Sequence, residues 1–228
     1  MPNATLSNRL MTAVGFVRRG SVFADIGTDH AHLPIYLYKN NMVKKAIAAD
    51  VNPMPLEIAR KNISLNSAQK GIETVLSDGL DRIKEYSPDD IAIFGMGGEL
   101  ICRIISDAEW TKNNSVRLIL QPMTKQEDVR RFLLDNGYSI IGEAVSYDDG
   151  KFYQTICAEY SGENEKYSEA ELILGKHNIK NGGVLFSDFV KNRIEVYKNR
   201  QKGKMLAGLG EEEEKLISEF EKILEETE

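Results

Sequence analysis

The fold of this chain is decided at residues 22–34, which read VFADIGTDHAHLP. A short apolar run ends at the carboxylate of Asp25, a turn of small and polar residues follows, and the next segment has a helical composition. The pattern predicts a strand, a loop and a helix. Ligands of open α/β sheets bind outside the carboxyl ends of the strands, so Asp25 and Gly27 are expected at a binding site. Gly27 permits a tight turn and a close approach of the ligand to the backbone.

The loop after this strand differs from the loop of dinucleotide-binding proteins. That loop reads Gly-x-Gly-x-x-Gly, whereas only Gly27 is present here and Asp29 occupies the loop. A carboxylate disfavours a pyrophosphate and suits a ligand with a cationic amine, such as S-adenosylmethionine. On this stretch alone, an ordinary strand-to-helix turn with a solvated Asp29 remains the simpler interpretation.

The first 160 residues repeat the alternation of strand and helix. We expect strands at 22–26, 45–50, 72–76, 91–94 and 116–120. We expect helices at 6–17, 31–40, 54–66, 99–106 and 125–136. Residues 138–147 and 152–160 alternate in polarity around a turn at 148–150, which predicts a final antiparallel pair. The pattern predicts an α/β, Rossmann-like sheet that is mostly parallel, and the antiparallel last strand is typical of class I methyltransferases.

The remaining residues, 161–228, form a second part of the chain. The polar stretch 161–166 is the expected boundary, so the predicted domains are 1–160 and 161–228. Helices are expected at 167–181, at 188–205 with Ser187 as N-cap, and at 211–226, with a turn at 206–210. The last two helices predict a C-terminal helical hairpin, or a short antiparallel coiled coil.

The charge of the chain is unevenly distributed. The net charge of −6 argues mildly against a nucleic-acid partner, because phosphate contacts need Lys and Arg. Residues 189–206 are nevertheless strongly basic, and residues 211–228 are strongly acidic. In a hairpin, the acidic run at 211–214 would neutralise Lys202 and Lys204. The candidates for tracking a phosphate backbone are then Lys191, Arg193, Lys198 and Arg200.

Several classes of protein are disfavoured by composition. No apolar run among the 228 residues approaches a membrane span, and no secretory signal is evident, so no membrane association is expected. The two cysteines lie far apart, which suggests reduced thiols and a cytoplasmic protein. His30 and His32 lack further ligands at metal-binding spacing, so no metal site is expected.

Polar residues follow three further predicted strands. Asp50 could accept both hydroxyls of a ribose, or it could cap the following helix. Asp78 could accept a hydrogen bond from an exocyclic amine of adenine, although an aspartate before Gly79 is also a common turn. Gln121 and Pro122 could provide an amide for a base edge, or they could simply end a strand.

A glycine-rich segment follows the predicted strand at 91–94. It reads Gly95, Met96, Gly97, Gly98. Three glycines in four residues are entropically costly, so the backbone must pass close to another group. That group is either a bound cofactor and acceptor, or the helix that begins near Gly98. The position after a central strand favours the first interpretation.

Three motifs in order resemble one known family. DIGTDHAHLP at 25–34, GMGGELI at 95–101 and LILQP at 118–122 look like those of the bacterial tRNA (adenine-22-N1)-methyltransferase family, TrmK. The resemblance covers most of the first 160 residues, and the C-terminal hairpin also fits. It implies a class I methyltransferase fold, S-adenosylmethionine as the methyl donor, and N1 of an adenosine in the D-arm of tRNA as the acceptor.

The resemblance also implies roles for individual residues. The expected cofactor-binding residues are Asp25, Gly27, Thr28, Asp29, His30, Asp50, Val51, Asp78, Gly79 and Gly95. The expected catalytic residues are Asp29, Gly95, Met96, Gly97, Gly98, Gln121 and Pro122. Residues 1–160 would bind S-adenosylmethionine and catalyse, and residues 161–228 would bind tRNA through the four basic side chains named above.

Two other functions stay open at this point. The chain could be an S-adenosylmethionine-dependent methyltransferase of another substrate, which the basic hairpin disfavours. It could also be a non-catalytic RNA-binding module on a methyltransferase fold, which Asp25, Asp50 and the glycine-rich segment disfavour. The sequence does not determine the oligomeric state or the set of tRNAs accepted.

Overall fold

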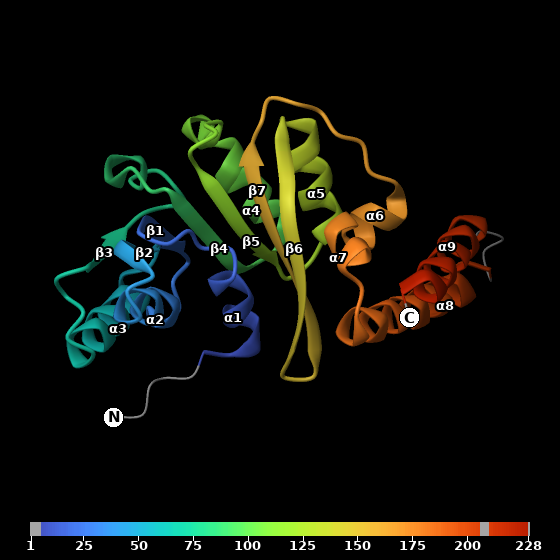
Figure 1. The fold of residues 1–228 in the computed structure, drawn as a ribbon, viewed down its shortest axis with the longest axis horizontal. Helices are drawn as coiled ribbons and strands as arrows, with labels where there is room; N and C mark the ends of the chain where they lie inside the picture. Colours follow the sequence, from blue (N-terminus) through green and yellow to red (C-terminus); the bar gives the residue numbers. More distant parts are fainter. Residues whose placement is uncertain (1–5, 206–209, 228) are drawn as a thin grey trace.

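The computed structural model describes residues 6–205 and 210–227. Its centre is a seven-stranded sheet in the order β3-β2-β1-β4-β5-β7-β6 (Figure 1). The strands are β1 Ser21–Ile26, β2 Val43–Asp50, β3 Ile72–Leu76, β4 Asp90–Met96, β5 Arg117–Pro122, β6 Tyr138–Asp148 and β7 Lys151–Tyr160. β1 to β5 pair in parallel, whereas β7 lies antiparallel between β5 and β6. The predicted α/β class and antiparallel last strand are confirmed.

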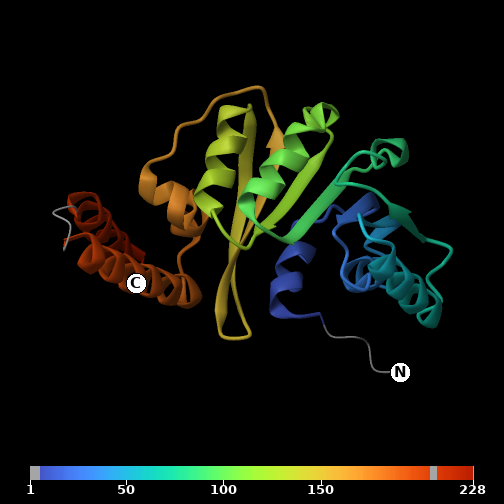
Figure 2. The same ribbon diagram turned by 180° about the vertical axis from the view of Figure 1, so that it is seen from behind.

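Helices cover both faces of the sheet (Figures 1 and 2). The helices of this part are α1 Asn8–Val14, α2 His32–Lys39, α3 Pro53–Leu65, α4 Gly98–Ser106 and α5 Gln126–Asp135, with short 3₁₀ turns η1 Lys84–Tyr86 and η2 Glu109–Thr111. α1, α2 and α3 pack in one core cluster, and α4 and α5 pack in another.

The central strands are apolar because both of their faces are buried. In β1, Ala24 and Ile26 face the cluster that contains α4, while Phe23 faces the cluster that contains α2. β4 repeats this arrangement, with Ile91 and Ala92 on opposite faces. Parallel strands covered on both faces therefore read as nearly continuous apolar runs, as this chain does at 22–26 and 91–94.

α1 is fastened to the turn between β6 and β7. Asn8 Nδ2 donates to the carbonyl of Tyr147 at 3.1 Å, and the Arg9 N–H donates to Asp148 Oδ2 at 3.3 Å. The hydroxyl groups of Thr12 and Thr155 lie 2.7 Å apart. Since β7 runs antiparallel to β5, this turn lies at the carboxyl ends of the parallel strands, with α1 beside it (Figure 1).

The C-terminal part ends in the predicted helical hairpin. Its helices are α6 Glu169–Leu174, α7 Lys176–Asn181, α8 Val184–Met205 and α9 Glu211–Thr227. The rings of Tyr197 on α8 and Phe220 on α9 meet edge to face at 5.3 Å. Lys198 and Glu221 form an ion pair of 3.1 Å between the same helices. Most of the turn expected between them, residues 206–209, lies outside the described residues.

Two helix predictions in this part are wrong. The segment 167–181 is two helices rather than one, because Gly175 has φ +89° and a Cβ there would lie 2.7 Å from the Glu143 carboxylate. Ser187 is not an N-cap, because α8 begins three residues earlier and the Ser187 N–H donates to the carbonyl of Gly183 inside the helix.

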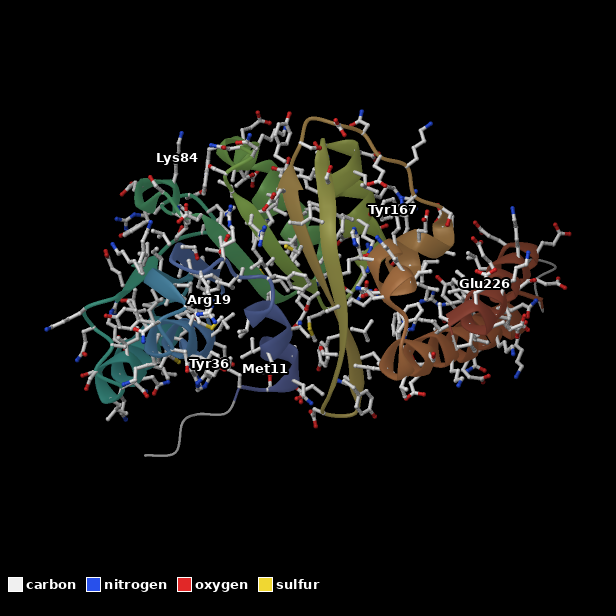
Figure 3. All side chains as sticks on the ribbon, viewed as in Figure 1. Met11, Arg19, Tyr36, Lys84, Tyr167 and Glu226 are labelled. Carbon is white, nitrogen blue, oxygen red and sulfur yellow. The ribbon has the colours of Figure 1, made fainter. Side chains whose placement is uncertain are left out.

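A buried ion pair connects the two parts. Arg130 on α5 and Glu143 on β6 are fully buried and lie 2.6 Å apart. Arg130 also donates to the carbonyl of Leu172 on α6 and to Gln154 Oε1, both at 2.7 Å. Tyr167 lies on the connection that carries the chain from β7 to α6 (Figure 3). The guanidinium of Arg130 thus joins α5, β6, β7 and α6.

Candidate active site

A cavity of about 630 Å³ opens at the carboxyl ends of the parallel strands. It is lined by the end of β1 and the loop after it, the start of α2, the end of β4, the helix α1, the β5–α5 connection and the β6–β7 hairpin. Its lining residues are Ser7, Arg9, Leu10, Asp25, Gly27, Asp29, His32, Leu33, Phe94, Gly95, Met123, Asp148, Asp149 and Tyr153. Four predicted site residues meet here, namely Asp25, Gly27, Asp29 and Gly95.

Asp25 is a buried carboxyl group in the wall of this cavity. It is only 7% exposed, and burial raises its pKa from 3.8 to about 6. The hydroxyl of Thr28 donates to Asp25 Oδ2 at 2.6 Å and opposes this rise. Asp29 and Asp50 raise the pKa further, and Arg9 lowers it. A cationic ligand group placed here would stabilise the ionised form.

Asp29 and His30 occupy the loop that follows β1. The Asp29 side chain is 83% exposed, and His30 Nε2 lies 3.3 Å from Asp29 Oδ1. Asp29 is therefore a solvated carboxylate at the rim of the cavity, in contrast to the buried Asp25. His30 and Ala31 both have positive φ, which turns the chain sharply into α2.

Gly27 is packed directly against Met96. Gly27 has φ +70°, and a Cβ at this position would collide with Met96 Cε. The thioether of Met96 therefore lies across the backbone of the loop after β1. Position 27 needs a glycine for its backbone conformation and for this contact.

Asp50 and Val51 follow β2. One oxygen of Asp50 accepts the N–H of Asn52 at 2.7 Å, so part of its role is to shape the turn into α3. Asn52, not Asp50, occupies the N-cap position. The second carboxylate oxygen remains for a ligand. Val51 is 56% exposed, which leaves an apolar surface beside this carboxylate.

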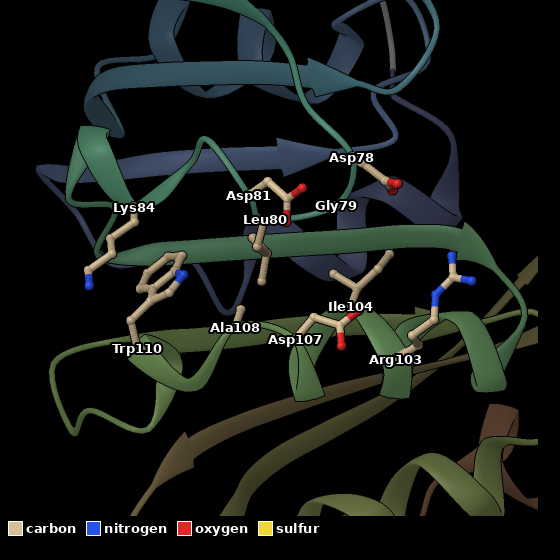
Figure 4. Close-up of a pocket in the computed structure, with 10 residues that line it drawn as sticks. All are labelled: Asp78, Gly79, Leu80, Asp81, Lys84, Arg103, Ile104, Asp107, Ala108 and Trp110. Atoms are coloured by element: carbon tan, nitrogen blue, oxygen red, sulfur yellow. The ribbon is translucent and has the colours of Figure 1, made fainter.

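Asp78 and Gly79 line a second cavity, of about 480 Å³, between the β3–β4 connection and α4. Figure 4 shows Asp78 and Arg103 towards one end of this cavity, and Lys84 and Trp110 towards the other. Of the residues assigned to the cofactor from the sequence, Asp78 and Gly79 line this second cavity, and Asp25, Gly27, Asp29 and Gly95 line the first. Thr28, His30, Asp50 and Val51 line neither of these two cavities.

The glycine-rich segment serves two structural purposes. Gly95 has φ +75° and lines the cavity at the carboxyl ends of the strands, and Met96 ends β4. Gly97 is the N-cap of α4, and Gly98 is its first residue. A Cβ on Gly98 would lie 2.7 Å from the carbonyl oxygen of Lys125, so this glycine permits α4 to pack against the β5–α5 connection.

Gln121 is fully buried, and its amide is completely engaged. Its Nε2 donates to the carbonyl of Arg9 at 3.1 Å and to Thr155 Oγ1 at 3.0 Å. Its Oε1 accepts from Arg9 Nη1 at 3.3 Å. Gln121 therefore acts on the cavity through Arg9. Pro122 is buried as the last residue of β5, and so it lies within the strand.

Sequence reasoning missed Arg9 and Tyr153 as site residues. The Arg9 guanidinium lies 5.7 Å from the centre of the Tyr153 ring, and both side chains line the cavity. Asp148 and Asp149 were interpreted only as turn residues, but they line the cavity too. No local motif marks these residues, because their position depends on how α1 and the hairpin dock onto the sheet.

The four basic candidates on α8 have different surroundings. Lys198 is paired with Glu221, as described above, and Lys191 is exposed. Arg193 and Arg200 line a cavity against the β5–α5 connection. Lys202 is exposed, and the side chain of Lys204 lies outside the described part of the structure.

Among residues 6–205 and 210–227, no helix has the length and apolar character needed to cross a membrane. Within the same residues, no group of three or more His, Cys, Asp or Glu side chains is arranged to hold a metal ion.

The chain is similar in sequence to known methyltransferases. A family model described as a methyltransferase domain matches residues 6–156. The tRNA (adenine(22)-N(1))-methyltransferase of Bacillus subtilis (strain 168) is 34% identical over 175 residues, which are 77% of this chain and 74% of that protein.

Two solved structures extend the similarity over nearly the whole chain. Streptococcus pneumoniae Sp1610, in complex with S-adenosyl-L-methionine, is 30% identical with a TM-score of 0.85, covering 96% of this chain and 100% of that chain. M. capricolum TrmK, in complex with S-adenosyl-homocysteine, is 28% identical with a TM-score of 0.80, covering 98% of this chain and 99% of that chain. This chain therefore belongs to the methyltransferase-domain proteins and, within them, to the tRNA (adenine(22)-N(1))-methyltransferase family.

Proposed function

We propose that this protein transfers a methyl group from S-adenosylmethionine to N1 of adenine-22 in the D-arm of tRNA. The observation that carries the proposal is the cavity at the carboxyl ends of the strands. The end of β1 and the loop after it present the carboxyl groups of Asp25 and Asp29, and α1 and β7 present Arg9 and Tyr153. One cavity can thus hold a cationic donor against a planar acceptor.

The residues present fit S-adenosylmethionine. The pKa of the buried Asp25 is raised despite the nearby charge of Arg9, and a ligand ammonium beside it would stabilise its ionised form further. Asp50 would accept the ribose hydroxyls through the oxygen that the turn leaves free, with Val51 against the adenine. Thr28, His30 and Gly95 would complete the methionine side, and Asp78 and Gly79 the adenine side.

The chemistry requires little acid–base assistance. When bound, S-adenosylmethionine supplies a methyl group on a cationic sulfur, which transfers to N1 and leaves S-adenosylhomocysteine. Adenine N1 carries a lone pair and no proton, so the protein needs no general base. Its task is to align the two groups and to tolerate a cationic product. Asp29 would balance this charge, and the backbone of Gly95, Met96, Gly97 and Gly98 would form the floor beneath the transferred methyl.

The acceptor side must bind an unpaired base. N1 lies on the Watson–Crick edge of adenine, so the nucleotide has to be flipped out of its helix. Tyr153 is the aromatic side chain in the cavity on which such a base would stack, with Arg9 beside it. Gln121 would position Arg9 through its side-chain amide, and Pro122 would end the strand that carries Gln121.

We assign the two parts of the chain to two tasks. Residues 1–160 would bind the cofactor and catalyse, and residues 161–228 would hold the tRNA body through α8. Lys191, Arg193, Lys198 and Arg200 remain the proposed basic contacts on that helix. A tRNA substrate would place the protein in the cytoplasm.

The proposal is tested by labelled methyl transfer. The full-length protein is incubated with S-adenosylmethionine carrying a labelled methyl group and with an unmodified tRNA transcript. Label is expected in the tRNA, and Asp50→Ala is expected to reduce both cofactor binding and transfer. Cofactor binding without transfer to any tRNA would reject the acceptor and favour another substrate.

A further inference from the structure

A third cavity, of about 300 Å³, lies between α8 and the connection from β5 to α5. Its lining residues are Thr124, Lys125, Gln126, Glu127, Gln154, Ile173, Arg193, Tyr197 and Arg200. We infer that this cavity binds a backbone phosphate of the tRNA strand that enters the catalytic cavity. The inference rests on the proposed function, and it assigns a specific anion site where the two parts of the chain meet.

Helical spacing brings two arginines to this cavity. Arg193, Tyr197 and Arg200 are spaced by four and three residues, so they share one face of α8. The Arg193 guanidinium lies 5.5 Å from the centre of the Phe189 ring, and that of Arg200 lies 4.8 Å from the centre of the Tyr197 ring. Stacking on an aromatic ring holds a guanidinium in a fixed plane, which suits bidentate recognition of a phosphate.

The Arg193 guanidinium has a neutral hydrogen-bond acceptor, because its Nη2 donates to Asn192 Oδ1 at 2.7 Å. Arg193 is half-buried, and its buried Nε has no hydrogen-bond acceptor in the described part of the chain. Burial lowers the pKa of Arg193, and so does the nearby charge of Arg200, whereas Tyr197 and Glu127 oppose this shift. Glu127 is the acid that lines this cavity, and Lys125 is paired with Glu99 outside it. An anion between the arginines would relieve both the burial and the repulsion.

The opposite wall of the cavity contributes a fixed neutral donor. Gln154 is 5% exposed, and its Oε1 accepts from Arg130 Nη2 at 2.7 Å. Because a guanidinium only donates, this bond fixes the orientation of the amide and leaves Nε2 as the donor group of Gln154. A charged arginine pair on one wall and an oriented amide on the other is the composition of an anion site.

The position of the cavity points to the substrate backbone. Met123 lines the catalytic cavity, and the next residue, Thr124, lines the third cavity. The two cavities therefore flank one short segment of the β5–α5 connection. A phosphate held by Arg193 and Arg200 would belong to a nucleotide close in sequence to the flipped adenosine. The site would therefore orient the tRNA strand towards the cavity as well as contribute to its affinity.

The first test measures tRNA affinity against salt concentration for single charge removals. Arg193→Gln and Arg200→Gln are each expected to weaken binding about tenfold and to lower the salt slope by about one. Lys202→Gln, an exposed lysine on the same helix, is the matched control and is expected to change affinity by about twofold or less. Affinity for S-adenosylmethionine should stay unchanged in all three. Arg200 is exposed, so its variant should fold even if Arg193→Gln does not.

The second test localises the phosphate. tRNAs that carry one neutral methylphosphonate linkage, at each position next to adenine-22, are compared on the wild type and on Arg200→Gln. One linkage should weaken wild-type binding about tenfold and have little further effect on Arg200→Gln, because the two changes remove the same contact.

The outcomes separate this inference from the proposed function. Equal losses for Arg200→Gln and Lys202→Gln, with normal methylation by the wild type, would overturn the phosphate site and leave the function standing. The phosphate site would also be overturned if, at every neutral linkage, the losses of tRNA affinity caused by the linkage and by Arg200→Gln were additive. Absence of tRNA binding by the wild type would reject both.

Discussion

Gln121 holds Arg9 at the edge of the catalytic cavity through two hydrogen bonds. Gln121 Oε1 accepts from Arg9 Nη1 at 3.3 Å, and Gln121 Nε2 donates to the Arg9 carbonyl at 3.1 Å. The strand β5 thereby fixes both the backbone and the guanidinium of a residue on α1. The proposed acceptor side of the cavity would depend on this contact between residues far apart in the sequence.

Gln121→Ala should therefore impair catalysis more than cofactor binding. The change releases Arg9 and leaves buried hydrogen-bonding groups unsatisfied, which should lower the free energy of unfolding by about 1–3 kcal/mol. We expect a reduced kcat for tRNA with a nearly unchanged Kd for S-adenosylmethionine. Gln69→Ala, on the surface, is the control and should change neither. A normal kcat for Gln121→Ala would contradict a role for Arg9 in positioning the acceptor.

The raised pKa of Asp25 predicts a pH dependence of cofactor affinity. A ligand ammonium favours the ionised carboxylate, so affinity for S-adenosylmethionine should fall as pH decreases below about 6, by up to about tenfold per pH unit. Asp25→Asn should bind weakly and lose this dependence between pH 5 and 7. Asp135→Asn, an exposed acid on α5, should retain it. Titration calorimetry measures both quantities, and a flat profile for the wild type would contradict the pairing of Asp25 with a cationic ligand.

The same pKa shift makes the free energy of unfolding depend on pH. The folded protein binds the Asp25 proton more tightly than the unfolded chain does, because the pKa rises from 3.8 to about 6 on folding. The stabilising contribution is present below about pH 4 and is lost as pH rises towards 6, by roughly 3 kcal/mol. Asp25→Asn should therefore be more stable than the wild type at pH 7 in urea unfolding. Equal free energies of unfolding for Asp25→Asn and the wild type at pH 7 would indicate that ionisation of Asp25 does not destabilise the folded protein.

Gly27→Ala should lower the free energy of unfolding more than Gly150→Ala does. Both Gly27 and Gly150 have positive φ, at +70° and +74°, but only Gly27 would bring a Cβ against Met96. Gly150→Ala should cost about 1 kcal/mol from backbone strain alone, and Gly27→Ala should cost more and weaken cofactor binding. Met96→Ala should partly rescue the stability of Gly27→Ala. Equal costs at the two positions would show that Met96 does not constrain the loop.

A substitution at Asp50 can distinguish binding of the ligand from stabilisation of the turn into α3. Asp50→Asn keeps an oxygen that can accept the Asn52 N–H, so the turn should persist, while the charged acceptor for a ribose is lost. We expect Asp50→Asn to unfold like the wild type and to bind S-adenosylmethionine about tenfold more weakly. Asp135→Asn, an exposed acid on α5, is the control. Unchanged affinity for Asp50→Asn would restrict this residue to the turn.

The sequence predicts the part of the site that follows from the positions of residues at the ends of neighbouring strands. The carboxyl ends of β1 and β4 must meet at one edge of a parallel sheet, so Asp25, Gly27, Asp29 and Gly95 could be placed together without coordinates. Arg9 could not, since its place depends on the docking of α1 onto the β6–β7 hairpin.

Long-range contacts also explain the errors in the C-terminal part. The break between α6 and α7 follows from the approach of Glu143 to Gly175, two residues whose proximity no local pattern reveals. The pairing of Lys198 with Glu221 depends on the register of α8 against α9. The arginine cavity likewise depends on a contact between α8 and the β5–α5 connection, and only the basic character of α8 is visible in the sequence.

The central claim is most directly tested by locating the methyl group. An unmodified tRNA transcript is methylated by the full-length protein with S-adenosylmethionine, then digested and analysed by mass spectrometry, alongside a transcript with guanosine at position 22. We predict N1-methyladenosine at position 22 of the first transcript and no methylation of the second. A methyl group at another nucleotide, or equal methylation of both transcripts, would contradict the account.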